Sequence, residues 1–172
     1  GRTPLREALM RMSSNGLIVQ LPRRGLIVKD IEAAEHVTLI ETRRVIEKLI
    51  ASSAARRATP QLRESILASG AQMVIAAHNG KLDEFMASDM ALDHVVHEAC
   101  RNPSAVAAVT PLIIKCRRFW YAYQHEGDMH EAARCHMLLA QGIADGNEEA
   151  AAKGADNLMD YLESYTHKVI NG

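Results

Sequence analysis

From residue 31 onward, helix-breaking pairs divide the sequence at short intervals, and between them there is almost no strand-like alternation of polar and apolar residues. Segments of this kind are typical of helices of ordinary length. The pattern predicts six of them: Ile31–Arg57, Pro60–His78, Leu82–Arg101, Ala105–Glu126, Met129–Asp145 and Glu148–Ile170. Because the predicted connections are short, we expect an antiparallel six-helix bundle.

The ends of several predicted helices carry their own signals. Thr59, Ser104 and Asp128 are suited to accept a hydrogen bond from the free N–H groups of a first helical turn. Pro111 lies inside the fourth predicted bundle helix, where it should bend the helix or mark a late start.

The first 30 residues follow another pattern. Apolar residues such as Leu5 and Leu9 recur at helical spacing as far as Gly16, a suitable C-terminal cap. Two short apolar runs then flank the turn Leu21-Pro22-Arg23-Arg24-Gly25, which predicts a β-hairpin. The chain is therefore predicted to be mainly α-helical, with a helix and hairpin in residues 1–30 and the bundle in residues 31–172.

Length and composition exclude several classes of protein. With 172 residues, 48% of them hydrophobic, the chain can bury a sizeable core without disulfides or metal. Its three cysteines form no Cys-x-x-Cys pair, which favours free thiols in a reducing cytoplasm. No apolar run approaches the roughly 18 residues of a membrane-spanning helix.

The net charge of −1 conceals an asymmetry. Residues 1–30 contain six basic and two acidic side chains, whereas residues 31–172 contain fourteen basic and nineteen acidic ones. A basic end on an acidic body indicates contact with a polyanion at that end only. A short helix bearing Arg2 and Arg6 suits the major groove of DNA, and a hairpin tipped by arginines suits the neighbouring minor groove or its phosphates.

Two carboxylates and a histidine are candidates for a site within the bundle. Asp89 and Asp93 are four residues apart, so they share one face of the third bundle helix. A bundle can bring His136 of the fifth helix opposite them, and such groups on facing helices build metal sites. The alternative is a solvated acidic face and an unrelated histidine. Other histidines, His36 among them, are expected at the surface.

The stretch 115–123 combines basic residues with the only tryptophan of the chain. Here Arg117 is suited to bind the carboxylate of a small ligand while Trp120 packs against it. The alternative is that the aromatic residues belong to the core and the arginines to the surface. Arg43 also has two interpretations: it either binds an anion or pairs with Glu47 one turn away.

These features resemble a family of bacterial transcription regulators. The residues Arg2-Thr3-Pro4-Leu5-Arg6-Glu7-Ala8-Leu9, Gly16-Leu17 and Pro22-Arg23-Arg24-Gly25 resemble the recognition helix and wing of the GntR family. The helical remainder resembles the effector domain of its FadR subfamily, through Arg43-x-x-x-Glu47, Asp89, Asn102-Pro103, His136 and Gly146. The resemblance implies DNA contacts through Arg2, Thr3, Arg6, Arg23, Arg24 and Gly25. It also implies that two supporting helices precede residue 1, so we expect residues 1–172 alone to bind operator DNA weakly.

The resemblance also implies a metal site, but an incomplete one. Many members of the subfamily hold a divalent ion with one aspartate and three histidines. Counting from Asn102, Asp89 matches the aspartate and His136 one histidine, while Asp93 and Leu158 replace the other two. Asp89, Asp93 and His136 remain a candidate set for Zn, Ni or Mn with water completing the shell; alternatively, the pocket has lost its ion. A shifted register would use Asp93 and His97.

The resemblance thus predicts a ligand-responsive regulator in two parts: residues 1–30 belong to a winged helix-turn-helix, and residues 31–172 bind the effector and dimerise. The effector is expected to be a small carboxylate that meets Arg43, Asp89, Asp93, Arg117, Trp120 and His136. Its binding is expected to release the dimer, most commonly a repressor in this family, from a palindromic operator. Two other functions stay open: a metal-dependent enzyme with His97 as base, and a helical interaction module without a small ligand.

Overall fold

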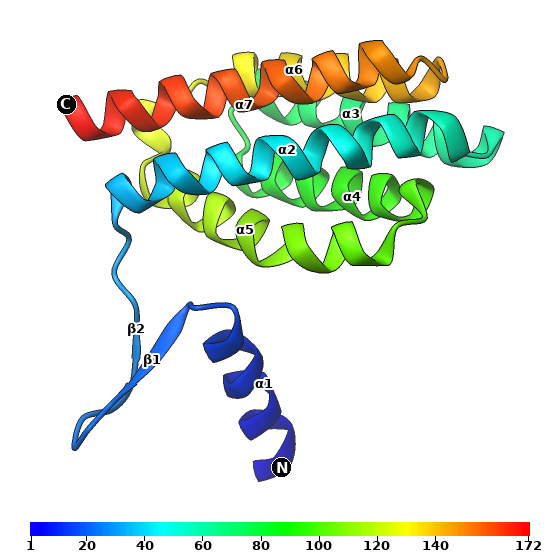
Figure 1. Ribbon diagram of the computed structural model, residues 1–172. Helices are drawn as coiled ribbons and strands as arrows, with labels where there is room; N and C mark the ends of the chain where they lie inside the picture. The colour runs from blue at the N-terminus through cyan, green and yellow to red at the C-terminus, as the bar shows by residue number, and fades with distance from the viewer.

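Seven α-helices and one β-hairpin make up the structure, a computed structural model that describes all residues 1–172 (Figure 1). Helix α1 (Arg2–Ser14) and the strands β1 (Ile18–Leu21) and β2 (Gly25–Val28) come first. The bundle helices follow: α2 (Ala33–Arg57), α3 (Pro60–His78), α4 (Leu82–Cys100), α5 (Pro103–Ala122), α6 (Met129–Ala144) and α7 (Glu148–Asn171). The mainly helical fold class and the six-helix bundle predicted from the sequence are confirmed.

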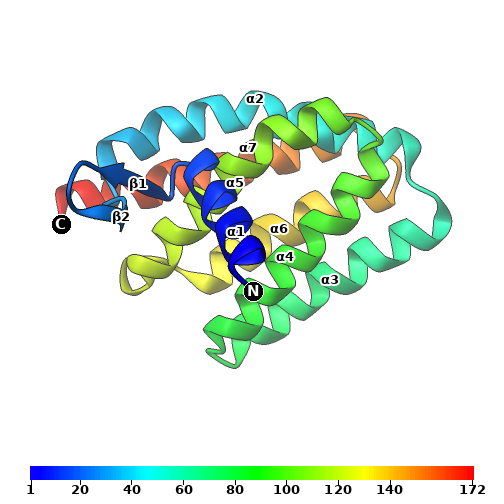
Figure 2. The same cartoon turned by 90° about the horizontal axis from the view of Figure 1, so that it is seen from below.

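The bundle is built around one apolar core of 32 buried residues. Helices α2, α7, α6, α3 and α4 form a ring in which each packs on the next, and α5 packs against α2 (Figures 1 and 2). α6 and α7 approach very closely, because a Cβ atom added at Gly154 would stand 2.6 Å from the Cα atom of Leu139. This contact fixes α6, and with it His136, inside the bundle.

Two of the three predicted helix caps are confirmed. The side chain of Thr59 accepts from Leu62 N, and that of Asp128 accepts from the first turn of α6. The prediction for Ser104 is wrong, since Oδ1 of Asn102 accepts from Ala105 N instead and α5 begins at Pro103.

Helix α5 also ends earlier than the sequence suggests. It ends at Ala122 and is followed by a short 3-10 helix, Gln124–Glu126. A Cβ atom at Gly127 would lie 2.8 Å from the ring of Trp120, so the chain turns back here at a distance that only glycine allows. Pro111 lies within α5 without ending it.

The N-terminal helix and hairpin lie outside the bundle (Figure 1). α1 has no buried residue. The hairpin pairs Ile18 with Val28 and Leu21 with Gly25, as expected for an antiparallel two-stranded sheet. Its turn holds Arg23 at a φ of 62° and Gly25 at a φ of 77°. The basic helix and the arginine-tipped hairpin are thus separate, exposed elements at one end of the molecule.

The three cysteines, Cys100, Cys116 and Cys135, are free and buried, as expected from their spacing. None of the helices combines the length and the apolar character that crossing a membrane requires.

Candidate functional site

Four charged side chains meet between α4, α5 and α6. Asp89 and Asp93 of α4 both bind Arg117 of α5: its Nε lies 2.5 Å from Oδ2 of Asp89, and its Nη2 lies 2.6 Å from Oδ2 of Asp93. On the other side of Asp89, Nε2 of His136 in α6 lies 3.1 Å from Oδ1. The structure therefore brings Asp89, Asp93 and His136 together and sets Arg117 between the two carboxylates. These four residues are the charged cluster.

The hydrogen bonds of His136 define its protonation state. Nδ1 lies 2.8 Å from the carbonyl oxygen of Ala132, which can only accept, so Nδ1 carries a proton. Nε2 faces the carboxylate of Asp89 and carries a proton as well when that carboxylate is ionised. Burial disfavours this charge, but the hydrogen bond and the charge of Asp89 outweigh burial and raise the pKa of His136 above its ordinary value. Both ring nitrogens thus face groups that accept hydrogen bonds, which favours the imidazolium form of His136.

The two aspartates of the cluster have opposite pKa shifts. Burial disfavours ionisation of Asp89, but His136 and then Arg117 outweigh burial and hold its pKa below the ordinary range. Burial, followed by the negative charge of Asp89, raises the pKa of Asp93 to about 7. With both aspartates ionised, the two carboxylates balance Arg117 and His136, and the charged cluster is neutral. Asp93 is the group that can take up a proton near neutral pH.

A second arginine lies beside the charged cluster. Nε of Arg43, on α2, is 2.8 Å from Oε1 of Glu47, and both side chains are buried, with 7% and 9% of their surface exposed. Arg43 thus makes the pair that its spacing allows, inside the bundle and not at the surface. The pairing with Glu47 is thus confirmed, and the same side chain lines a cavity together with Arg117.

The cavity next to the charged cluster is small. Its volume is about 30 Å³, and its wall combines Arg43, Asp89, Arg117 and His136 with apolar side chains, Trp120 among them. Such a volume admits about two water molecules, so a metabolite requires the helices to separate further. The ion pairs of the two arginines use Nε and Nη2 of Arg117 and Nε of Arg43. Other N–H groups of both guanidinium ions remain for an anion.

Trp120 serves both the cavity and the core. It is only 6% exposed, and its ring centroid lies 5.7 Å from that of Phe85 and 5.6 Å from that of Tyr165. One edge of this aromatic cluster faces the cavity. The two interpretations of the aromatic stretch are therefore compatible.

The charged cluster does not fit a divalent metal ion. No group of three or more His, Cys, Asp or Glu side chains has a geometry suited to hold one. Asp93, at one family ligand position, is bound to Arg117, and Leu158, at another, is a core residue that is 3% exposed. The shifted register would use Asp93 and His97, and there Asp93 is again occupied by Arg117, although Nε2 of His97 is buried without a hydrogen-bond partner.

The residues predicted to contact DNA are exposed and fall in two places. Arg2, Thr3 and Arg6 lie on α1, and Arg23, Arg24 and Gly25 form the tip of the hairpin. The N–H group of Arg24 donates to the carbonyl oxygen of Leu21 at 3.2 Å, which closes the turn and leaves both arginine side chains outside it. Both places offer cations to a polyanion.

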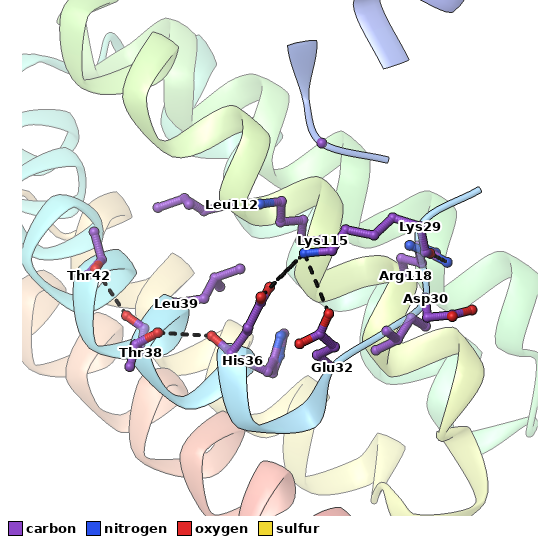
Figure 3. A pocket seen from close by; sticks show the side chains of 13 residues that line it. Lys29, Asp30, Glu32, His36, Thr38, Leu39, Thr42, Leu112, Lys115 and Arg118 are labelled. Carbon is purple, nitrogen blue, oxygen red and sulfur yellow. Dashed lines mark hydrogen bonds and ion pairs between the residues drawn. The ribbon is translucent and has the colours of Figure 1, made fainter. Parts of the chain in front are cut away.

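A second cavity, of about 310 Å³, lies where the hairpin joins the bundle (Figure 3). Nη2 of Arg118, on α5, donates to the carbonyl oxygen of Lys29 in the linker that leads to α2. Nζ of Lys29 lies 3.0 Å from Oε2 of Glu35 on α2. The linker is thus bound to two bundle helices.

His36 strengthens this junction. Its ring stacks on that of Phe119, with centroids 3.9 Å apart and an angle of 4° between the planes. The expectation of a surface histidine is wrong here, since His36 is 5% exposed. Burial, followed by the charge of Arg43, lowers its pKa to about 4, so the ring is neutral at physiological pH.

Sequence reasoning missed the junction residues Lys29, His36 and Arg118. A signal for Arg118 was present, because consecutive residues on a helix point about 100° apart. If Arg117 faces the interior of the bundle, Arg118 has to meet a different partner. The sequence offered no comparable signal for the linker, which has no regular structure and hence no periodicity.

Most of the helical bundle matches a known domain. Residues 38–161 match the family described as the FCD domain. The chain is 35% identical over 156 residues to the Nta operon transcriptional regulator of Aminobacter aminovorans, and the match covers 88% of this chain and 70% of that protein.

Solved structures share the whole arrangement. E. coli McbR/YncC superposes with a TM-score of 0.84 at 16% identity, over 99% of this chain and 82% of that one. Streptococcus agalactiae GntR superposes with a TM-score of 0.62 at 15% identity, over 97% of this chain and 82% of that one. At such identities the likeness concerns the fold alone.

Because Arg117 pairs with both carboxylates of the charged cluster, we expect the stability of the folded protein to depend on this residue. Replacing Arg117 with Ala leaves Asp89 and Asp93 buried with one cation fewer, so we expect the free energy of unfolding to fall by about 3 kcal/mol. Adding Asp93→Asn to Arg117→Ala should recover part of that loss, because it removes one of the unpaired charges. Urea denaturation at pH 7.5 measures both effects.

Arg134→Ala, which breaks an exposed pair with Glu131, is the control and should leave the midpoint unchanged. An equally stable Arg117→Ala protein would contradict the assignment.

Proposed function

Because this chain belongs to the FCD-domain family of GntR-type transcriptional regulators, we propose that it binds operator DNA as a homodimer and releases it when a small carboxylate enters the bundle. Transcription is then repressed until the ligand arrives. Residues 1–30 supply DNA contacts, and residues 31–172 supply the ligand site and the dimer contact. The observation that carries the ligand half is the pair of arginines, Arg43 and Arg117, on one cavity wall. The relatives give no support to a metal-dependent enzyme.

The exposed arginines at the N-terminal end support the DNA half of the proposal. Arg2 and Arg6 are exposed on α1, which we assign as the recognition helix, and Arg23 and Arg24 are exposed at the tip of the hairpin, which we assign as the wing. Guanidinium groups bind guanine edges and phosphates in forked geometry. In this assignment α1 reads bases and the hairpin tip binds the backbone.

A carboxylate suits the ligand site because of its charges. The site presents two guanidinium ions with N–H groups that their ion pairs do not use, beside an apolar wall. When both aspartates are ionised, the charged cluster has no net charge. A bound anion adds one negative charge, and Asp93 offsets it by taking up a proton, since its pKa is about 7. Lower pH therefore favours binding of the carboxylate: protonation of Asp93 removes a negative charge from the side of Arg117.

The surface of α2 supports a dimer. Val45 and Leu49 lie one turn apart on its outer face and are 71% and 51% exposed. Large exposed apolar side chains that adjoin on one helix mark an interaction surface. A palindromic operator requires two copies of the DNA-binding element related by a two-fold axis, and a second copy of α2 on this face supplies that symmetry.

Four consecutive residues of α5 connect the ligand site with the DNA-binding end. Arg117 belongs to the charged cluster, and Trp120 lines its cavity. Between them, Arg118 binds the linker at Lys29, and Phe119 stacks on His36. A ligand that shifts Arg117 and Trp120 therefore also shifts Arg118, which binds the linker. The distance between the two winged elements of the dimer changes as a result.

In a protein that also carries the two supporting helices implied by the family resemblance, the DNA half predicts two different responses to mutation. Replacing both Arg23 and Arg24 with Ala should weaken binding to every duplex and lower the slope of log K against log salt by about 2, because two phosphate contacts are lost. On a duplex selected from random sequence, Arg6→Ala should cost about 1 to 3 kcal/mol at one base-pair position only. Fluorescence anisotropy over a salt series measures both. Arg134→Ala, far along the chain on α6, is the control, and an unchanged salt slope for the double variant would contradict the wing assignment.

The ligand half predicts release of DNA by a carboxylate. In a panel of short mono- and dicarboxylates, at least one should raise the melting temperature and release the selected duplex, more strongly at pH 6 than at pH 8. Arg117→Gln should lose both effects. Asp93→Asn should bind the same carboxylate about tenfold more tightly, because it removes the competing charge.

A further variant separates binding from release. Arg118→Ala keeps the ligand site but loses the contact with Lys29, so the carboxylate should still raise its melting temperature while DNA release becomes weaker. If no carboxylate acts on the wild-type protein, or if Arg117→Gln responds normally, the proposed ligand class is wrong.

A further inference from the structure

We propose that Arg117 is the resident cation of this bundle, held where a divalent ion would otherwise bind, so that the native protein keeps no metal between Asp89 and Asp93. The proposal concerns the protein before any effector binds and does not depend on which effector that is. Three observations carry it: the contacts of the carboxylates, the cations already present, and the hydrogen bonds of His136.

The carboxylate oxygens are already bound to cations. Oδ2 of Asp89 and Oδ2 of Asp93 each accept from the Arg117 guanidinium, at 2.5 Å and 2.6 Å, and Oδ1 of Asp89 faces His136. A planar guanidinium with several donors bridges two carboxylates as a metal ion does, but it needs no water to complete its shell. Arg117 therefore meets the requirement that two close, buried acids impose.

The number of charges leaves no place for a further dication. The guanidinium of Arg117 lies between the two carboxylates, His136 lies against Asp89, and the neighbouring pair Arg43–Glu47 balances itself. A divalent ion would add two positive charges to a partly buried group of side chains that already holds its own cations. It would also lie against the guanidinium, and like charges repel strongly at such distances in a medium of low dielectric constant.

His136 has no free ring nitrogen while Arg117 holds Asp89 in place. Its Nδ1 donates to the carbonyl oxygen of Ala132, and its Nε2 hydrogen-bonds to Asp89. A histidine must present a free nitrogen to bind a metal, so Nε2 would first have to leave Asp89. The remaining ligand position is Leu158, which has no donor atom.

Removal of the guanidinium should therefore create a metal site. Without Arg117, Asp89, Asp93 and His136 present two carboxylates and one imidazole from the facing helices α4 and α6. This is a ligand set suited to several first-row divalent ions. The expected outcome is a gain of metal binding on loss of one arginine.

The experiment compares metal content and melting temperature in four proteins: wild type, Arg117→Ala, Arg117→Lys and Arg118→Ala. Each is purified with chelator, incubated with Zn²⁺, Ni²⁺ or Mn²⁺, desalted and analysed for metal, and its melting temperature is measured with and without the ion. Wild type and Arg118→Ala, the adjacent arginine outside the charged cluster, should keep no metal and show no shift. Arg117→Ala should retain one ion per chain and bind it at least about tenfold more tightly than wild type. Arg117→Lys keeps a positive charge near the carboxylates but cannot bridge both of them, so it should bind the ion more weakly than Arg117→Ala does.

Two results would overturn the proposal. One is wild-type protein that retains a stoichiometric ion at this site, abolished by His136→Gln, or that melts at a lower temperature in chelator. The other is a folded Arg117→Ala protein that binds no metal. If Arg117→Ala does not fold, Arg117→Gln replaces it, and the metal content of the wild type alone still tests the first half of the proposal.

Discussion

Two partly buried carboxylates one turn apart on α4 impose the constraint on which the rest of the site depends. The side chains of Asp89 and Asp93 are 14% and 20% exposed, so their negative charges have to be offset from within the protein. The balancing cations come from different helices, Arg117 from α5 and His136 from α6. The ion pairs with Arg117, together with the contact between Phe85 and Trp120, join α4 to α5. The charged cluster therefore sets the relative position of three helices as well as the chemistry of the cavity.

This arrangement makes α5 the natural element for communication. Its residues 117 to 120 face in turn the charged cluster, the linker, the ring of His36 and the cavity. A helix turns by about 100° per residue, so four consecutive positions reach all sides of it. The interior of the bundle and the segment that carries the hairpin are thus joined through one rigid element, without a long chain of intermediate contacts.

The helices were predictable from the sequence because their signals are local. Breakers such as Thr59-Pro60 and caps such as Asp128 act within one turn, and the core residues between them repeat with the helical period. The end of α5 was not predictable, because it depends on the approach of Gly127 to Trp120, a contact that forms only when the bundle packs. The same holds for His36, whose stacking partner lies on another helix.

The charged cluster was predictable in part. The spacing of Asp89 and Asp93 places them on one face of a helix, and the resemblance to a known family sets His136 across from them. Arg117 was singled out for its aromatic surroundings, but its partners could not be inferred, because they depend on the rotation of α5 relative to α4. That rotation decides whether Asp89, Asp93 and His136 are free to bind a metal ion or are occupied by the guanidinium of Arg117.

The protonation state of His136 tests the central claim most directly. The account requires an imidazolium at neutral pH, with one proton donated to Ala132 and the other to Asp89. Nitrogen-15 NMR of the histidine side chains at pH 7.5, with the signal of His136 assigned by its loss in His136→Gln, reports the state of each ring nitrogen. We expect both nitrogens to be protonated, with no change on addition of chelator. An unprotonated Nε2, or a signal that shifts when chelator removes a bound ion, would contradict the account.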